Sequence, residues 1–525
     1  MFTKRLKVIK LMGMVMVALM AVSCVDSLNT SPIDDNVVTS NQVFENPENF
    51  KKVLAKMYAG LAVTGQQGPA GQPDIQGIDE GFSSYIRQYW VHQVLSTDEA
   101  VVAWNDPGLP QFNSISWGSS NDFVRAMYSR LYYQITLANE FIREAQGREE
   151  AAVQVYLAEA RFLRALSYLH AFDLYGGNIP FVTEADPIGS YMPEPATPQE
   201  LFDYIESELL AIEGELPSPR GNDYGRADQG SVWTLLAKLY LNAEVYTGTD
   251  RYADALVYAT KVIDEGGYSL ADNYEYLFMT DSDQTSDEII FAVRFDGDSM
   301  RTFGGTTFIV HAAVGGNMDA SQFGIGGGWA GHRVTPEFVS LFEGNEEGWA
   351  DGRALFHTNG QTLEIENIGE FTEGYAITKW KNVSSAGVPG KNNEFVDIDF
   401  PMLRLADVYL MFAEAAVRTG SETGRALSLV NELRERAYGD DSGQITAAEL
   451  DLDFILDERA RELYWEGHRR TDLRRFGRFT SGEYVWSWKG GVQEGRSTPD
   501  HFNLFPIPTA DLNENLNLTQ NPGYN

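Results

Sequence analysis

The chain has 525 residues, with 75 acidic side chains against 40 lysines and arginines, and a formal net charge of −35. A chain this negative repels the phosphate backbone, so nucleic acid is not expected as a partner. Its single cysteine, Cys24, excludes an intramolecular disulfide and a cysteine-rich zinc site. The fold must therefore be stabilised by packing.

Residues 1–23 have the pattern of a signal peptide. Basic residues from Lys4 to Lys10 precede an apolar run, Leu11 to Val22, that is too short to span a bilayer. The run ends in Ala-Val-Ser followed by Cys24, which resembles a bacterial lipobox, so Cys24 is expected to carry lipid chains and residues 24–46 to form a tether. The alternative is an ordinary cleaved signal with an incidental cysteine. No later apolar run predicts a transmembrane span.

Apolar residues at helical spacing predict about eight helices. From Val153 to Tyr175 they recur in steps of three and four, which defines one buried stripe, and Gly176-Gly177 ends that helix. Similar stripes predict further helices over 47–63, 123–145, 198–216, 232–246, 252–263, 404–418 and 425–438. Short turns join several of them into hairpins. We therefore expect a mainly α fold of tetratricopeptide-like helical pairs, within 47–63, 123–265 and 404–438 of a single body, 47–525.

Two stretches have a different texture, rich in glycine and aromatic residues. They cover 65–117 and 268–400, and the second contains a β-prone run from Glu288 to Val293. Long ordered loops in a helical protein are the usual place for binding function. We expect the ligand-binding region there.

Ordered sequence blocks resemble the SusD/RagB family of nutrient-uptake outer-membrane lipoproteins. They are Arg161 to Ala165, Leu174 to Pro180, Gly225 to Asp228, Arg404 to Leu410 with Ala413 to Ala415, Asn431 to Ala437, Glu458 to Leu463, Glu466 to Leu473, Leu504 to Pro508 and Gln520 to Tyr524. The resemblance implies a SusD-like fold, an outer-membrane location facing outside the cell, and a TonB-dependent SusC-like transporter as partner.

Most charged residues in these blocks are interpreted as structural. In a helix predicted from Asp457 to Arg470, the pairs Asp457–Arg461 and Glu466–Arg470 are four residues apart. Arg161 and Arg164 are expected to pair between helices. The glycine run from Gly324 to Trp329 lacks the dinucleotide fingerprint, and no zinc-hydrolase histidine spacing or nucleophile elbow occurs. We expect no catalytic residue, metal or cofactor.

The candidate binding site combines aromatic and planar polar side chains. Sugar rings have an apolar C–H face and a hydroxyl rim, which such side chains match. The sequence is similar to the starch-binding branch of the family, and this implies sugar-face contacts by Trp104, Phe303 and Trp329, with Arg87 as a hydroxyl donor and Asn105 beside them. Phe303 stands where that branch has a tyrosine, so a hydroxyl bond would be lost.

Neighbouring residues receive a structural interpretation. Trp90, Trp117 and Trp233 are expected in the core. Asp98 and Glu99 are expected to accept hydrogen bonds that organise a loop rather than to bind sugar.

The resemblance implies a non-catalytic surface protein that captures oligosaccharides, with an α-glucan such as a maltooligosaccharide as the first candidate. The acidic surface would repel polyanionic glycans unless local basic residues offset it, which also favours neutral sugars. The alternatives are a surface glycoside hydrolase, which needs two positioned carboxylates, and a relative that binds a β-1,3-glucan or a peptide.

Overall fold

The computed structural model describes residues 40–189 and 191–524. The chain divides into two compact units, Met1–Phe50 and Lys51–Asn525. The described part of the first contains α2 (Ser40–Phe44) and the start of α3 (Pro47–Ala62). The predicted signal peptide, Cys24 and the tether up to residue 39 lie outside the described residues. No helix within 40–189 and 191–524 is long and apolar enough to cross a bilayer.

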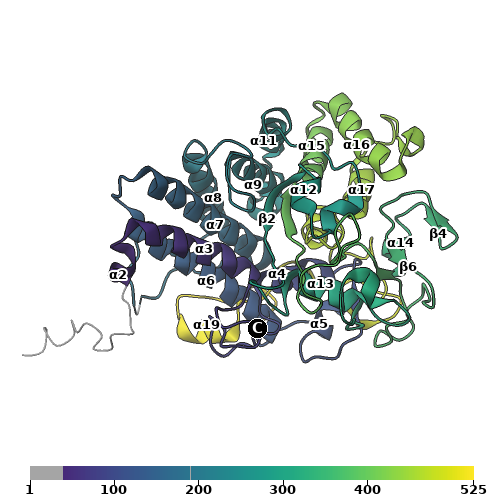
Figure 1. The fold of residues 1–525 in the computed structure, drawn as a ribbon, viewed down its shortest axis with the longest axis horizontal. Coiled ribbons are helices and arrows are strands. Elements are labelled where there is room, and N and C mark those ends of the chain that lie inside the picture. Colours follow the sequence, from purple (N-terminus) through teal and green to yellow (C-terminus); the bar gives the residue numbers. More distant parts are fainter. Residues whose placement is uncertain (1–39, 190, 525) are drawn as a thin grey trace, which may run out of the picture. The chain divides into compact units, whose positions relative to one another are not determined.

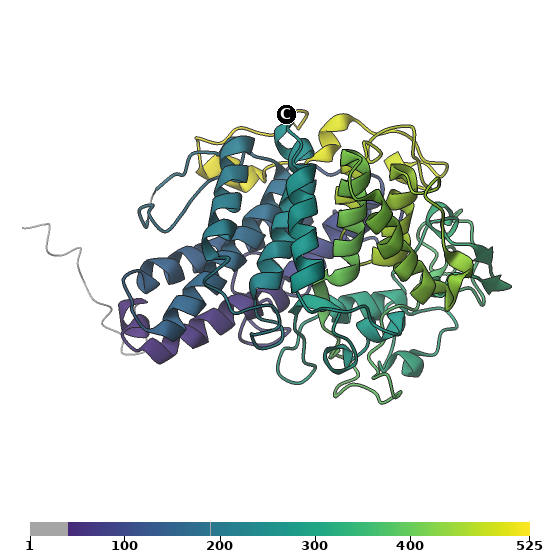
Figure 2. The same cartoon turned by 90° about the horizontal axis from the view of Figure 1, so that it is seen from above.

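Long helices form the frame of the second unit (Figure 1, Figure 2). After α3 they are α6 (Asp122–Ala145), α7 (Ala151–Tyr175), α8 (Pro198–Ile212), α9 (Gln229–Leu241), α11 (Tyr252–Glu265), α15 (Leu405–Thr419) and α16 (Thr423–Tyr438). α6 packs on α7, α9 on α11 and α15 on α16, while α8 contacts both α7 and α9, and α11 contacts α15. The predicted mainly α fold of tetratricopeptide-like pairs is confirmed.

Local capping explains where several of these helices begin and end. The Asn121 side chain accepts hydrogen bonds from the first backbone amides of α6, and Thr197 forms a capping box with Glu200 at the start of α8. Such side chains satisfy amides that have no partner within the helix. Gly176 ends α7 with φ +80°, a conformation that favours glycine.

Shorter helices fill the connections between the long ones. They are α4 (Tyr85–Trp90), the π-helix η2 (Val91–Leu95), α5 (Pro110–Asn113), α10 (Ala243–Thr247), η3 (Tyr274–Phe278), α12 (Ser282–Thr285), α13 (Gly305–Ala313), η4 (Ala320–Phe323), α14 (Pro336–Val339), η5 (Asp441–Gly443), α17 (Leu452–Leu463), α18 (Arg469–Arg475), η6 (Lys489–Gly491), η7 (Asp500–Asn503) and α19 (Thr509–Glu514). The irregular stretch 65–117 thus includes a buried helix, α4 with η2.

The strands are short and pair two by two, all antiparallel. β1 (Val101–Val102) pairs with β3 (His332–Arg333), β2 (Ile289–Val293) with β8 (Phe400–Arg404), β4 (Gly344–Asn345) with β5 (Gly348–Trp349), and β6 (Phe356–His357) with β7 (Ala376–Ile377). β2 confirms the β-prone run at Glu288. β8 continues directly into α15, and its last residue, Arg404, is buried in the core.

Several structural interpretations of single residues are confirmed. Trp90, Trp117 and Trp233 are buried. Arg161 on α7 donates to Glu208 on α8 over 2.9 Å, and Arg164 donates to the other oxygen of the same carboxylate over 2.7 Å. These pairs connect neighbouring helices, as expected.

Glu462 on α17 is the centre of a buried ion-pair network. Its carboxylate receives Arg353 at 2.9 Å, Arg404 at 2.7 Å and Arg436 at 2.5 Å. Burial alone would raise the pKa of Glu462, but the three guanidinium groups hold it well below its usual value. The network extends to Glu288, which pairs with Arg404 at 2.7 Å. It therefore connects α17, α16, the end of β8, the residue before β2 and the segment around residue 353.

The helix predicted from Asp457 to Arg470 is wrong, because it is broken into α17 and α18. Trp465 and Gly467 between them have φ of +64° and +85°. The predicted Glu466–Arg470 pair is wrong for the same reason. Asp457 and Arg461 both lie on α17 and interact electrostatically, but the short ion pair of Arg461 is to another residue. Arg461 pairs with Glu458 at 2.8 Å, and the turn directs Glu466 to Lys379 at 2.7 Å and Arg404 at 2.6 Å.

Replacing Glu462 by alanine is expected to lower the free energy of unfolding by about 3–5 kcal/mol, because three buried guanidinium groups lose a shared partner. Denaturant unfolding of the purified protein measures this loss of free energy of unfolding. The control is Asp264→Asn, which removes the exposed partner of Arg425 and should change stability by less than about 1 kcal/mol. Equal effects of the two substitutions would contradict a central role for Glu462.

Candidate functional site

The β1–β3 pair brings Trp104 and Trp329 together from two distant loops. Beyond β1 the ladder continues, since the backbone amide of Ala103 donates to the carbonyl of Gly331 over 2.8 Å. The indole Nε1 of Trp104 then donates to the carbonyl of Trp329 over 2.9 Å. The two ring centroids lie 6.3 Å apart with 49° between the ring planes. Both side chains are half-buried, so two angled ring surfaces are partly open to solvent.

The end of α13 fixes the position of Trp329. The last carbonyls of a helix lack intrahelical partners, and here the loop supplies them. The amide of Trp329 donates to the carbonyl of His311 over 2.7 Å, and the amide of Gly331 to that of Ala312 over 2.8 Å. The His311 ring stacks on Trp329, with centroids 4.8 Å apart and 22° between the planes. Burial lowers the pKa of His311, which favours the neutral ring at neutral pH.

Gly331 is needed for the approach of Trp104. A Cβ atom at this position would lie 2.4 Å from Cζ2 of the Trp104 ring, well inside contact distance. The ring therefore packs directly on the backbone of the segment that precedes β3. This contact and the Nε1 hydrogen bond together determine the orientation of Trp104.

Arg87 on α4 is linked to Trp104 through the Phe308 ring. Its guanidinium carbon lies 4.3 Å from the centre of the Phe308 ring, and Phe308 in turn contacts Trp104 with centroids 6.1 Å apart. Nη1 of Arg87 donates to the carbonyl of Gly81 over 2.8 Å and to that of Phe303 over 3.4 Å.

Two nitrogen atoms of the Arg87 guanidinium group, Nε and Nη2, make no hydrogen bond to the described residues. Burial lowers the pKa of Arg87 to about 10, partly offset by Asp106 and Asp79, so the group is charged at neutral pH. Because Nε is buried, a ligand hydroxyl would have to accept from Nη2, which makes no hydrogen bond to the described residues.

The structure brings the predicted site residues Trp104, Trp329, Arg87 and Phe303 together around α13. Phe303 is half-buried, precedes α13 and packs on Phe395 with centroids 5.2 Å apart. Asn105 follows Trp104 and is exposed, and its side chain makes no hydrogen bond to residues that the structure describes. We call Trp104, Trp329, Phe303, Arg87 and Asn105 the aromatic site.

Asp98 and Glu99 are buried acceptors that bind distant segments of the chain. Asp98 receives both Nε and Nη2 of Arg469 over 2.8 Å. Glu99 receives the backbone amide of Trp465 over 3.0 Å, and burial raises its pKa. The expected acceptor role is confirmed. These bonds connect the loop before β1 to the turn between α17 and α18, and they are not made within the loop.

Phe308, His311 and Phe395 were missed by sequence reasoning. The helix Gly305–Ala313 that carries the first two is buried along its whole length, so its sequence shows no amphipathic stripe that points to a ligand. The glycine pair before it, Gly304-Gly305, was the available signal. A Cβ at Gly304 would lie 1.8 Å from the Ser84 hydroxyl oxygen, which shows how closely α13 approaches the start of α4.

A separate cavity of about 1100 Å³ lies between α3, residues 223–226 and the end of β2. None of the five residues of the aromatic site lines it. The aromatic site is an open surface formed by two rings, whereas this cavity is a concave basic hollow. Among the described residues, no cluster of three or more histidine, cysteine or acidic side chains is arranged to hold a metal ion.

Comparison with known proteins identifies the class to which this fold and site belong. A sequence model described as the SusD family matches residues 353–524. The starch-binding protein SusD of Bacteroides thetaiotaomicron is 37% identical, with 96% of this chain and 96% of that protein covered. A SusD-like protein of Bacteroides ovatus is 26% identical over 69% of this chain and 67% of its own length. The chain belongs to the SusD family.

Solved structures agree on the fold. The surface glycan-binding protein A of Bacteroides fluxus matches with a TM-score of 0.69 at 20% identity, covering 91% of this chain and 100% of that chain. A laminarin-binding SusD-like protein matches with a TM-score of 0.68 at 22% identity, over 91% of this chain and 100% of its own. The resemblance inferred from the ordered blocks is thus confirmed.

Replacing Gly331 by alanine is expected to displace the Trp104 ring, because the new Cβ would overlap it. The near-ultraviolet circular dichroism should change, and the free energy of unfolding should fall by about 1–3 kcal/mol. Gly327→Ala is the matched control, since a Cβ there meets nothing within 4 Å. Identical spectra for both variants would contradict the close packing of Trp104 on Gly331.

Proposed function

We propose that this chain is a non-catalytic, lipid-anchored surface protein that captures oligosaccharides and delivers them to a TonB-dependent SusC-like transporter in the outer membrane. The observation that carries the proposal is the angled pair of half-exposed rings, Trp104 and Trp329, with the Arg87 guanidinium linked to Trp104 through one further ring. The single body 47–525 would hold the site, and residues 24–46 would connect it to the anchor.

The chemistry of the aromatic site suits a sugar chain. Each ring offers a flat surface to the C–H face of a sugar, and a planar guanidinium group donates to hydroxyls at the rim. Because Trp329 is held by the end of α13 and Trp104 by Gly331, the rings are positioned before a ligand arrives. A preorganised site loses less entropy on binding. Phe303 and Asn105 would extend the surface on either side.

An α-glucan is the ligand class that we favour. The SusD relative, named a starch-binding protein, is 37% identical over nearly the whole chain. Two ring planes at 49° to each other also match a curved chain better than a flat one, and α-1,4-linked glucans are curved. A β-1,3-glucan is curved as well, so it is the natural comparison ligand.

The acidic residues of α17 and of the turn that follows it are better explained by structure than by hydrolysis. Glycoside hydrolysis needs two carboxyl groups that face a sugar cleft. Glu458 and Glu462 are instead fully buried against arginines, and Glu466 is buried against Lys379. These carboxylates are neutralised within the core, which supports the binding role.

Trp104→Ala and Trp329→Ala are each expected to weaken maltoheptaose binding by about tenfold or more, because each removes one stacking face. Calorimetry with maltoheptaose and laminarin oligosaccharides measures this. Trp349→Ala, at a half-buried tryptophan on β5, is the control and should bind as the parent does. Unchanged binding in both site variants would refute the site. Preference for laminarin oligosaccharides would replace the α-glucan, and newly released reducing ends in the same mixtures would refute the non-catalytic role.

Cys24→Ala is expected to release the protein from the outer membrane, because the lipid chains would have no attachment point. In the native bacterium the parent should fractionate with membranes and incorporate labelled palmitate. The variant should do neither and should still bind maltoheptaose. A variant that stays in the membrane fraction would show that anchoring does not depend on Cys24.

A further inference from the structure

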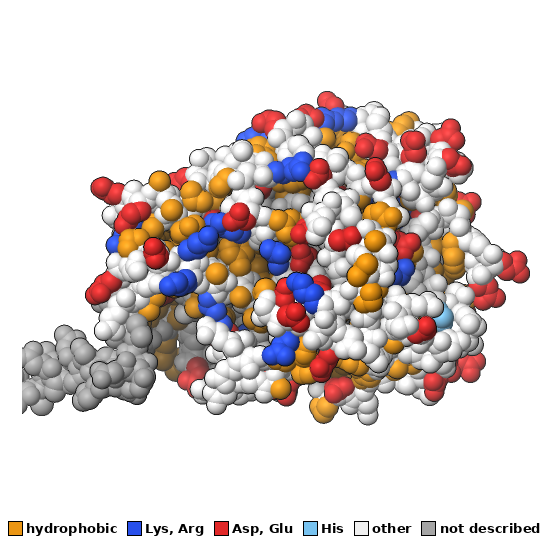
Figure 3. Space-filling model, viewed as in Figure 1, with side chains coloured by type: hydrophobic (Ala, Val, Ile, Leu, Met, Phe, Trp, Pro, Cys, Tyr) orange, Lys and Arg blue, Asp and Glu red, His pale blue; other side chains and the backbone are white. Residues whose placement is uncertain are grey.

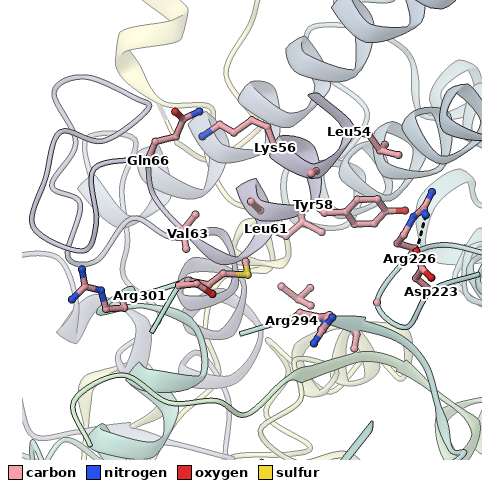
Figure 4. A pocket seen from close by; sticks show the side chains of 18 of the residues that line it. Leu54, Lys56, Tyr58, Leu61, Val63, Gln66, Asp223, Arg226, Arg294 and Arg301 are labelled. Atoms are coloured by element: carbon pink, nitrogen blue, oxygen red, sulfur yellow. Dashed lines mark hydrogen bonds and ion pairs between the residues drawn. The ribbon is translucent and has the colours of Figure 1, made fainter. Parts of the chain in front are cut away.

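The cavity beside α3 has a chemistry that the aromatic site does not share. Its floor is apolar and aromatic, with Leu61 and Val63 at the end of α3 and the Tyr58 ring projecting across it (Figure 4). Lys56, Arg294 and Arg301 extend around its margin in the same view. With a volume of about 1100 Å³, it exceeds a typical small-ligand pocket of about 300–1,000 Å³. It is large enough for an oligomer.

The charges at the margin do not cancel. Two of the lining cations are neutralised, since Lys56 pairs with Asp74 and Arg226 pairs with Asp223 at 3.0 Å and with Glu159. Three others, Lys51, Arg294 and Arg301, form no ion pair or hydrogen bond within the described part of the chain. Against them the cavity has one further acidic side chain, Asp298. An excess of positive charge therefore lines this cavity.

This excess is unusual on a chain with a net charge of −35. In Figure 3, several lysine and arginine side chains lie with hydrophobic ones over α3 and the middle of the face, with acidic side chains both among them and along the edges. At physiological salt, charges are screened beyond roughly 8 Å. A ligand in the cavity would consequently experience the local cations more strongly than the distant acidic surface.

Both arginines contact aromatic rings and neither forms an ion pair within the described part of the chain, although Arg294 interacts electrostatically with the buried Asp399. The guanidinium of Arg294 lies 5.8 Å from the centre of the Tyr224 ring, and that of Arg301 lies 5.8 Å from the centre of the Phe395 ring. Such contacts orient a guanidinium group and leave its N–H donors free. A fork of free donors matches the two oxygens of a carboxylate, or the oxygens of a sulfate.

The cavity is connected to the aromatic site through Phe395, which contacts a residue of each. Phe395 supports Arg301 on one side and packs on Phe303 with centroids 5.2 Å apart on the other. Residues 298–303 therefore line the cavity at one end and reach the aromatic site at the other. Gln66 and Gln67 add amide groups to the margin. An aromatic floor with amides and guanidinium groups is suited to sugar rings that carry negative charge.

We propose that this cavity is a second carbohydrate site, which takes the carboxylate or sulfate groups of an acidic oligosaccharide. The proposal rests on the proposed function in that the chain is taken to bind glycans. Arg294 and Arg301 would hold the anionic groups, and Tyr58 would face a sugar ring. The site allows an acidic protein surface to accept a charged glycan.

The test compares oligosaccharides that differ only in charge. Calorimetry on the full chain would use maltoheptaose, its C6-carboxylated form and its 6-sulfated form. Both acidic forms should bind about tenfold more tightly than the neutral one at physiological salt. The preference should disappear at about 1 M salt, where the Debye length is about 3 Å. Comparing the affinities of the carboxylated and sulfated forms shows which anionic group the site prefers.

Substitutions of cavity residues test whether the preference for acidic over neutral oligosaccharides arises in this cavity. Arg294→Gln with Arg301→Gln should abolish it and leave maltoheptaose binding unchanged, whereas Arg294→Lys with Arg301→Lys should keep most of it. Arg425→Gln with Arg496→Gln removes the same charge at residues that do not line the cavity and should have no effect. In Trp104→Ala with Trp329→Ala, the acidic forms should still bind.

The outcomes separate the two proposals. If the parent chain does not bind maltoheptaose, the proposed function of the aromatic site is contradicted. Binding of the carboxylated and sulfated forms still tests the second site in that case. Equal binding of neutral and acidic forms overturns the second site. So does an unaltered preference in Arg294→Gln with Arg301→Gln, or hexaglutamate binding as tight as that of the acidic sugars, since the cavity would then be a peptide site.

Discussion

The buried ion pairs around Glu462 are the constraint on which much of the structure depends. Burying so many charges carries a large desolvation cost, which only complete pairing offsets. Arg353, Arg404 and Arg436 reach Glu462 from three segments far apart in the sequence. The arginines also pair with neighbouring carboxylates, such as Asp351 and Glu288. The network therefore couples the packing of α17 to that of α16 and the β2–β8 pair.

The same region positions the aromatic site. After Glu462, the chain turns at Trp465, whose amide binds Glu99, and Arg469 binds Asp98. These residues stand immediately before β1, and β1 leads to Trp104. The loop that carries Trp104 is thus connected through Asp98 and Glu99 to the turn between α17 and α18. Loops held this way carry binding groups without the mobility that loops usually have.

Charge is distributed unevenly over the chain, and this matters for its ligands. Many of the arginines are buried in internal pairs with carboxylates, and these pairs leave the excess of acidic residues at the surface. Where cations remain unpaired, as around the cavity beside α3, they create a local potential of the opposite sign. Net charge describes long-range repulsion, while the unpaired groups decide what binds at a particular place.

The sequence by itself determined the helical frame, because apolar periodicity and glycine stops are local signals. It placed helices close to where α6, α7 and α15 lie, and the ordered blocks indicated the family. It also selected Trp104, Trp329, Phe303 and Arg87, which the structure brings together around α13. The distances between these residues could not be read from the sequence, because the meeting of Trp104 and Trp329 depends on the long-range β1–β3 pairing.

Only the tertiary structure decided the rest. The turn at Trp465 overrode a helical pattern, because Glu466 is stabilised by Lys379 and Arg404, which lie 87 and 62 residues away. The support of Trp329 by His311 and the basic cavity likewise join segments that are distant in the chain. Contacts between such segments leave no periodic trace in the sequence, so the physical partners become visible only when the chain is folded.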